Sequence, residues 1–139
     1  MSLYVLDTDA LTLLQRGHPQ VQQRATAVAQ TDLAITIITV EEQLTGWYSR
    51  LRRSTDPGSL AHVYEQMTAT VRHLSQVRIL SFTEPAIRRY DDLLALKLNV
   101  GKMDLRIAAI ALEHGATVVT RNVRDFGRVP GLTLEDWSV

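Results

Sequence analysis

Several oxygen-bearing side chains stand at the ends of segments that the sequence marks as regular structure. Asp7 directly follows the short apolar run of residues 4–6, which predicts a buried strand leading into a helix. In parallel α/β sheets, ligands bind beyond the carboxyl ends of the strands, so a carboxylate at this place is suited to chemistry. Four later residues also follow a predicted strand or open a predicted helix: Glu42, Asp104, Asn122 and Asp125.

The sequence between these residues predicts strands that alternate with helices. Apolar and β-branched runs predict four buried strands and one edge strand, at residues 4–6, 33–38, 77–82, 117–119 and 132–134. Caps and prolines predict helices that begin near residues 8, 19, 39, 57, 83 and 105. Such alternation favours the α/β class, with a mostly parallel sheet of four to five strands covered on both faces. The oxygen-bearing residues are then expected along one edge of the sheet.

Two of these carboxylates also have a purely structural interpretation as helix-start residues. Asp7 can cap the first helix, although Thr8 and Asp9 are nearer alternatives for the cap. Asp104 can favour the dipole of a helix over residues 105–114. For Asp7 we prefer the functional interpretation, because the position matches the rule for ligand sites in parallel sheets.

The middle and late positions have structural interpretations of their own. Residues 39–42 have the S/T-x-x-E form of a capping box, which predicts a helix start near Thr39 and makes Glu42 a capping residue. Residues 122–125 predict a short helical turn in which Asn122 caps the amide three residues on and Asp125 hydrogen-bonds to Asn122 in return. In that geometry Asn122 offers a neutral carbonyl oxygen at the edge of the sheet, while Asp125 mainly fixes the turn.

An acid cluster of this kind predicts a hard metal ion. Carboxylates that lack an equal number of basic neighbours repel one another, and a divalent cation offsets that repulsion. An all-oxygen ligand set favours Mg²⁺ or Mn²⁺. The four histidines show no zinc-ligand spacing, and neither a Ser-His-Asp or Cys-His arrangement nor a Gly-rich phosphate loop is present.

Four stretches, taken in order along the chain, resemble PIN-domain ribonucleases of the VapC toxin type. They are residues 6–9, 39–46, 104–109 and 119–126. The resemblance covers essentially the whole chain and implies a three-layer α/β/α sandwich, one or two Mg²⁺ or Mn²⁺ ions and endonucleolytic cleavage of RNA. It also implies a homodimer and neutralisation by a small cognate VapB-like antitoxin.

The resemblance assigns roles residue by residue. Asp7 matches the family's first metal ligand and Asp104 its third, and the distance to a following glycine selects Glu42 as the middle acid. We therefore expect these three residues to be both catalytic and metal-binding. Many PIN nucleases carry an acid where this chain has Asn122, so the fourth ligand is either Asn122 or Asp125.

Polar and basic residues beside the predicted site are candidates for RNA binding, and we select Thr8, Thr120, Arg121 and Arg124. Asp9 stands where the family often carries Asn, and its extra charge serves either as a contact to a site residue or as the helix cap. Fifteen basic and fifteen acidic residues cancel in the whole chain. Setting aside four metal-neutralised acids leaves a basic excess, so the zero net charge does not exclude RNA.

Length and composition predict one domain spanning residues 1–139. An apolar content of 45% suffices for one sizeable core, and the lack of cysteine suits a reducing compartment. Acidic residues interrupt the place where a signal peptide needs its apolar core, and no apolar run approaches the length of a membrane span. We therefore expect a cytoplasmic protein without membrane association. An apolar helical face at Trp47, Tyr48 and Leu51 is expected to be covered by a second copy or an antitoxin.

The predicted function is hydrolysis of RNA phosphodiesters by a water that a bound Mg²⁺ or Mn²⁺ activates. Two alternatives stay open at this point. One is a non-catalytic PIN-like module that binds RNA or protein, and the other is a DNA-directed nuclease built on the same acid cluster. Metal-dependent cleavage of labelled RNA and DNA oligonucleotides separates the three.

Overall fold

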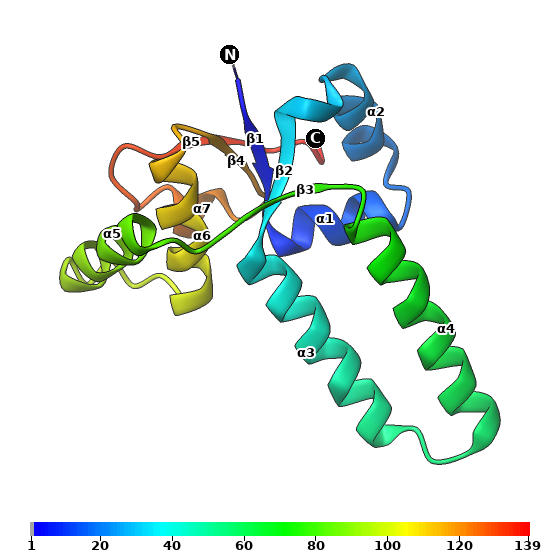
Figure 1. Cartoon of the computed structure of the whole chain (residues 1–139). Helices are drawn as coiled ribbons and strands as arrows, with labels where there is room; N and C mark the ends of the chain where they lie inside the picture. Colours follow the sequence, from blue (N-terminus) through cyan, green and yellow to red (C-terminus); the bar gives the residue numbers. More distant parts are fainter. Residues whose placement is uncertain (1) are drawn as a thin grey trace.

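The computed structural model describes residues 2–139 and places its strands in one five-stranded parallel sheet (Figure 1). The order across the sheet is β3-β2-β1-β4-β5. The strands are short, with bounds β1 Tyr4–Leu6, β2 Leu33–Thr36, β3 Arg78–Leu80, β4 Thr117–Val119 and β5 Thr133–Glu135. Because all paired strands are parallel, their carboxyl ends lie at one edge of the sheet.

Helices connect the strands and begin at the signals that the sequence carries. Pro19 and Pro57 are first helical residues, and the side chains of Asp56 and Thr83 cap the helices that follow them. The bounds are α1 Thr8–Gln15, α2 Pro19–Ala27, the 3₁₀ turn η1 Gln30–Asp32, α3 Ile37–Arg53, α4 Pro57–Leu74, α5 Glu84–Ala95, α6 Lys102–Glu113 and α7 Val123–Phe126.

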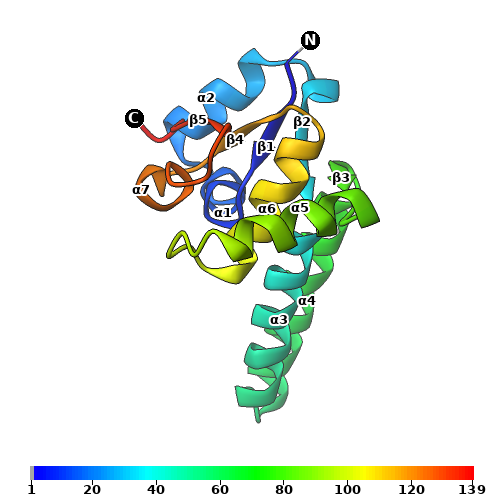
Figure 2. The ribbon, with the colours of Figure 1, turned by 90° about the vertical axis from the view of Figure 1, so that its left-hand side faces the viewer.

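Alternate strand residues feed two cores, one on each face of the sheet. Val5 and Val118 belong to the core formed with α5 and α6. Leu6 and Val119 belong to the core formed with α1, α2 and the buried Trp137. The sheet therefore lies between two helical layers (Figure 2), which confirms the predicted three-layer α/β/α sandwich.

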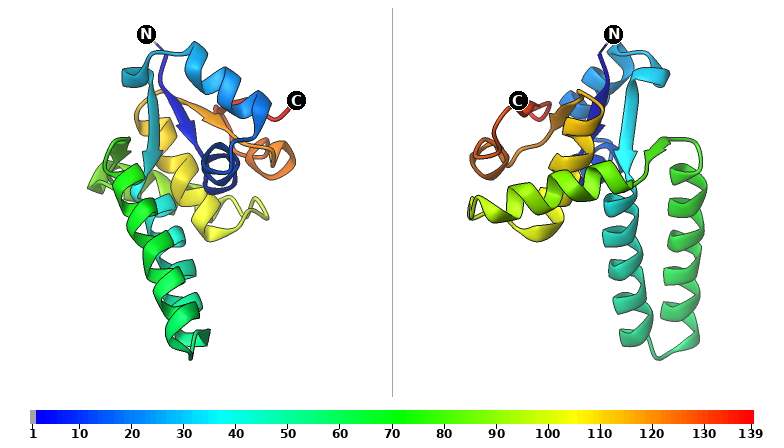
Figure 3. Two further views of the ribbon diagram at one scale, coloured as in Figure 1. Left: turned by 90° about the vertical axis from the view of Figure 1, so that its right-hand side faces the viewer. Right: turned by 60° about the vertical axis from the view of Figure 1, so that its left-hand side comes forward.

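The helices α3 and α4 form an antiparallel hairpin that projects away from the sheet (Figure 3). Its outer surface exposes Tyr48, Tyr64 and Val71, whereas Trp47 is partly buried. Although α4 is 18 residues long, no helix within residues 2–139 is long and apolar enough to cross a membrane.

The predicted strand at residues 33–38 is too long, and the capping box at residues 39–42 is wrong. The strand β2 ends at Thr36, whose hydroxyl accepts a hydrogen bond from the Thr39 amide at 3.3 Å and caps α3. The helix thus begins at Ile37, without a loop. The β-branched run 35–38 favours a strand only weakly, and the N-cap decides where the strand stops. The strand predicted at residues 77–82 is likewise shorter, at Arg78–Leu80.

Candidate active site

Asp7 lies at the carboxyl end of β1 and caps α1. Its Oδ1 accepts a hydrogen bond from the Ala10 amide at 2.8 Å, so Asp7 is the cap that we expected Thr8 or Asp9 to provide. The side chain is buried, and burial raises its pKa from 3.8 to about 6. A hydrogen bond with Thr120 and the Ala10 amide oppose this rise, while the charges of Asp9 and Asp104 add to it. Asp7 is thus fixed by hydrogen bonds in a place that disfavours its charge.

Glu42 reaches the same edge of the sheet from the second turn of α3. Because α3 begins at Ile37, Glu42 is too far along the helix to act in a capping box. The predicted capping role of Glu42 is therefore wrong. Its Oε1 instead accepts a hydrogen bond from the Thr8 hydroxyl at 2.5 Å. The same hydroxyl lies 3.1 Å from Thr39 Oγ1. Since Thr8 has only one proton to give, Thr39 is the donor in that second contact.

Asp104 is the third residue of α6, within the first turn of the helix, and is partly buried. Burial raises its pKa, and the negative charges of Glu42 and Asp125 raise it further. The helix start favours a carboxylate there, yet that favourable effect does not outweigh burial and repulsion. Asp104 therefore lies close enough to interact electrostatically with both Asp7 and Glu42, although the three residues come from separate segments.

These three acids line one open groove at the carboxyl edge of the sheet, which we call the acidic groove. Its lining also includes Asn122 and the basic residues Arg16 and Arg121. None of the ion pairs formed within residues 2–139 includes Asp7, Glu42 or Asp104. Their negative charge is therefore not balanced by direct contacts in this part of the chain.

The chemistry of this donor set fits a hard divalent cation. The side chains offer carboxylate and amide oxygens, which are the ligands of Mg²⁺ and Mn²⁺, and a cation offsets both the burial and the repulsion that raise the pKa of Asp104. Within residues 2–139, however, no three acidic or histidine side chains stand close enough to form a ready-made metal site. The donors of the groove therefore fit such an ion by the type of their ligand atoms.

The late turn has the hydrogen bonds that the sequence predicts. Asn122 Oδ1 accepts from the Asp125 amide at 3.4 Å, and Asn122 Nδ2 donates to Asp125 Oδ2 at 3.0 Å. Asp125 also pairs with Arg128 at 3.1 Å. Asn122 lines the acidic groove, whereas Asp125 is held by Asn122 and Arg128 and is not part of that lining. Of the two alternatives for the fourth ligand, Asn122 is the one placed at the groove.

The candidate RNA-binding residues differ in their environments. The Thr8 hydroxyl donates a hydrogen bond to Glu42. Thr120 is fully buried, and its hydroxyl accepts a hydrogen bond from the Asn122 amide at 2.9 Å. Arg121 lines the groove and donates two hydrogen bonds to Asp9, at 2.7 and 2.9 Å. Arg124 is exposed on α7 and is outside the lining.

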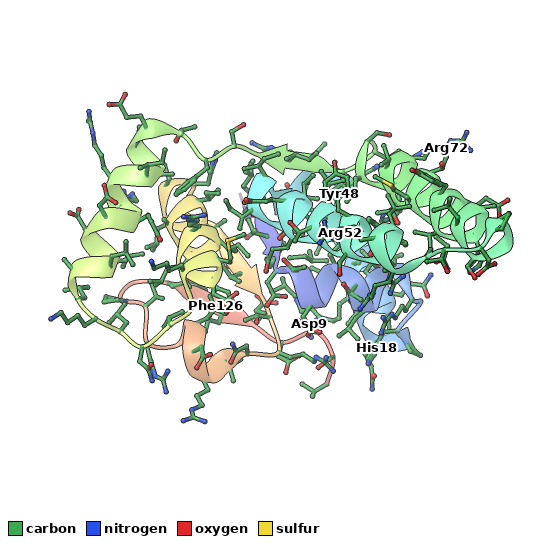
Figure 4. All side chains as sticks on the ribbon, turned by 90° about the horizontal axis from the view of Figure 1, so that it is seen from below. Asp9, His18, Tyr48, Arg52, Arg72 and Phe126 are labelled. Carbon is green, nitrogen blue, oxygen red and sulfur yellow. The ribbon has the colours of Figure 1, made fainter. Side chains whose placement is uncertain are left out.

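Asp9 thus neither caps α1 nor contacts an acid of the groove, since its carboxylate binds Arg121. Figure 4 shows Asp9 on the side of α1 that is turned away from α3. Sequence reasoning missed Thr12 and Arg16, which also line the groove. A signal was available, because Thr8, Thr12 and Arg16 follow one another at intervals of four, which places them on one face of a helix.

Comparison with known proteins agrees with this geometry. Residues 4–132 match the PIN domain family. Ribonuclease VapC2 of Rickettsia felis is 28% identical over 142 residues, covering 98% of each chain. The tRNA(fMet)-specific endonuclease VapC of Salmonella typhimurium is 28% identical over 141 residues, covering 99% of each. A solved toxin-antitoxin complex from Klebsiella pneumoniae aligns with a TM-score of 0.70 and 25% identity, over 94% of this chain and 95% of that one.

Proposed function

Because the chain belongs to the PIN-domain family, we propose that it is a Mg²⁺- or Mn²⁺-dependent endoribonuclease and the toxin of a type II toxin-antitoxin pair. One observation carries the proposal. Three acids, from the end of β1, from α3 and from α6, line one groove at the edge of the sheet where ligands bind, and none of them forms an ion pair within residues 2–139. The ribonuclease and endonuclease names of relatives that match nearly the whole chain support RNA as the substrate.

Asp7, Glu42 and Asp104 would hold the cation, with Asn122 contributing a neutral amide oxygen. When bound, the cation activates a water and neutralises charge on the scissile phosphate. The Ala10 amide and Thr120 orient Asp7, and the Thr8 hydroxyl orients Glu42. These hydrogen bonds hold the anionic forms in place before an ion arrives.

The basic residues of the groove suit the substrate's charge. Arg16 and Arg121 line it together with the acids, and each can contact a phosphate on either side of the scissile bond. Arg121 is oriented by its two hydrogen bonds to Asp9, which leave part of the guanidinium free for a further acceptor. Hydrolysis would leave a 5′-phosphate and a 3′-hydroxyl.

The proposed partners follow from the relatives. The structure from Klebsiella pneumoniae is named as a toxin-antitoxin complex, which supports a small VapB-like antitoxin for this chain. We also propose a homodimer in the cytoplasm, where its RNA substrate is found. Sedimentation at micromolar concentration, with and without the co-expressed neighbouring reading frame, tests both associations.

Cleavage assays with labelled RNA and DNA oligonucleotides test the enzymatic proposal. We expect RNA to be cut in Mn²⁺ or Mg²⁺ and to stay intact when EDTA is added. Cleavage of DNA in preference to RNA would instead assign a DNA-directed nuclease. A second candidate is a non-catalytic RNA-binding module. RNA that is bound but never cut in either metal would support that candidate.

A further inference from the structure

A second groove runs between α1 and the α3–α4 hairpin, and we call it the hairpin groove. Its walls include Gln43, Gly46, Trp47 and Arg50 from α3 and Gln66 from α4. Most of the side chains that line this groove are polar or charged, so it is not a hydrophobic docking surface. Gln15 and Gln43 hydrogen-bond to each other across it, at 2.9 Å for the shorter contact.

The two grooves are continuous. Thr12 and Arg16 of the α1 segment line both the acidic groove and the hairpin groove. A polymer that occupies the acidic groove can therefore pass along α1 into the hairpin groove without leaving the surface. Of the two, the acidic groove alone contains the acids of the candidate active site.

The charge of the hairpin groove is opposite to that of the acidic groove. The charged residues in its lining are Arg16 and Arg50, and no acidic residue lines it in the part of the chain that the structure describes. The guanidinium of Arg50 lies 4.9 Å from the centre of the Trp47 ring. A cation beside a partly exposed aromatic ring, among amide side chains, is the combination that binds phosphates and stacks bases in single-stranded nucleic acid.

Gly46 leaves room for a ligand in the wall of the hairpin groove. It lies in the interior of α3, where glycine is less favourable than alanine. A Cβ atom added at Gly46 would meet nothing within 4 Å, so packing within the chain does not require a glycine. The missing side chain leaves open space in the groove wall next to Trp47.

We propose that the hairpin groove binds the nucleotides of single-stranded RNA that flank the scissile phosphate, with Arg50 on a phosphate and Trp47 against a base. The proposal rests on the proposed ribonuclease function and deepens it, because it assigns part of the substrate to a site away from the acids. Continuity with the acidic groove and the basic lining favour RNA over an apolar protein segment.

Binding assays in EDTA test the proposal without requiring cleavage. A long single-stranded RNA and a short oligonucleotide that fills only the acidic groove are compared by fluorescence anisotropy. We expect Arg50→Gln and Trp47→Leu each to weaken binding of the long RNA by about tenfold. Arg50→Gln should also reduce the salt dependence of binding by about 0.7 in the log–log slope, because the variant neutralises one phosphate fewer. Binding of the short oligonucleotide should not change.

Arg72→Gln is the matched control. It removes the same charge from an exposed residue of α4, and Figure 4 shows Arg72 on the side of α4 away from α1. This variant should bind both RNAs as the unmodified chain does. Circular dichroism verifies that Trp47→Leu is folded. If Trp47→Leu does not fold, Arg50→Gln still tests the proposal, because Arg50 is exposed.

The outcomes separate the two proposals. Equal affinity of the long RNA for Arg50→Gln and the unmodified chain would overturn the hairpin-groove assignment, even if RNA is cleaved. Loss of long-RNA binding in Arg50→Gln, with no cleavage in any metal, would support the groove while refuting the ribonuclease. If Arg50→Gln disturbs only a complex with a small protein, the groove belongs to that protein and the RNA assignment is wrong.

Discussion

The acidic groove and the hairpin groove share Thr12 and Arg16. They differ in charge, because acidic side chains line only the first of the two within the described residues. In the acidic groove, Asp7, Glu42 and Asp104 form no ion pair within residues 2–139, and burial raises the pKa values of Asp7 and Asp104. In the hairpin groove, two arginines are present without an acid in the lining. The first therefore needs a cation from outside the chain and the second an anion. The residues proposed to cleave RNA and the residues proposed to bind it thus lie in separate grooves of one surface.

The largest expected effect comes from removing one charge of the acidic groove. Asp104→Asn should lower metal-dependent RNA cleavage by about a thousandfold, because the ion loses a charged ligand while the side-chain volume hardly changes. Relief of the repulsion from Glu42 and Asp125 should leave the metal-free melting temperature level or higher. Cleavage rates and thermal melts in EDTA measure both effects. Asp91→Asn on α5 is the exposed control, and full activity in Asp104→Asn would remove Asp104 from the site.

The next effect is a dependence of stability on pH. The pKa of Asp7 is about 6 in the folded chain and 3.8 in the unfolded one, so between these values the folded state binds more protons. Stability without metal should therefore fall as pH rises from about 4 to 6, by about 3 kcal/mol from this group.

Urea denaturation in EDTA across this range measures the slope. Asp7→Asn should flatten it and raise the metal-free stability at neutral pH, since Asn also caps helices well. With metal present, the ion competes with the proton, so affinity for Mn²⁺ should fall as the pH drops below about 6. A stability that instead increases from acid to neutral pH would show that Asp7 is not destabilised by its burial.

A smaller effect concerns the fourth ligand. Asn122 lines the groove while Asp125 is held by Asn122 and Arg128, so Asn122→Asp should tighten Mn²⁺ binding by about tenfold through added charge. Asp125→Asn should weaken binding less than Asp104→Asn does. Calorimetric titration with Mn²⁺ compares the three variants. If Asn122→Asp has no effect and Asp125→Asn eliminates binding, Asp125 is the fourth ligand.

The smallest expected effect is a change in stability from a substitution in the wall of the hairpin groove. Gly46→Ala should stabilise the chain by about 0.5–1 kcal/mol, because alanine favours the helix and its methyl group meets no atom. Urea denaturation gives the value. Cleavage of a short oligonucleotide should be unchanged by this variant, as the acids are untouched. Destabilisation would show that the wall at Gly46 is packed more tightly than the groove indicates.

Local sequence determined much of the fold. Four features were predictable: the strand at residues 117–119, the edge strand near residue 133, the prolines that start α2 and α4, and the turn at Asn122. These features depend on short-range physics: a proline or a cap acts within one turn, and an apolar run between turn signals is a buried strand in most contexts. The place of Asp7 after the first strand already favoured a functional role, and the resemblance to PIN-domain proteins added the preference for Glu42 as a site residue.

Tertiary structure alone decided what each side chain does at the site. The sequence predicted Glu42 in a capping box, but the hydroxyl of Thr36 starts α3 earlier and turns Glu42 toward Thr8 from another helix. Asp9 looked like a cap or a site contact, whereas Arg121, 112 positions away, binds it. The raised pKa of Asp7 likewise depends on burial by distant elements. Hydrogen bonds and burial of this kind depend on distances between elements, and a one-dimensional pattern contains no such distances.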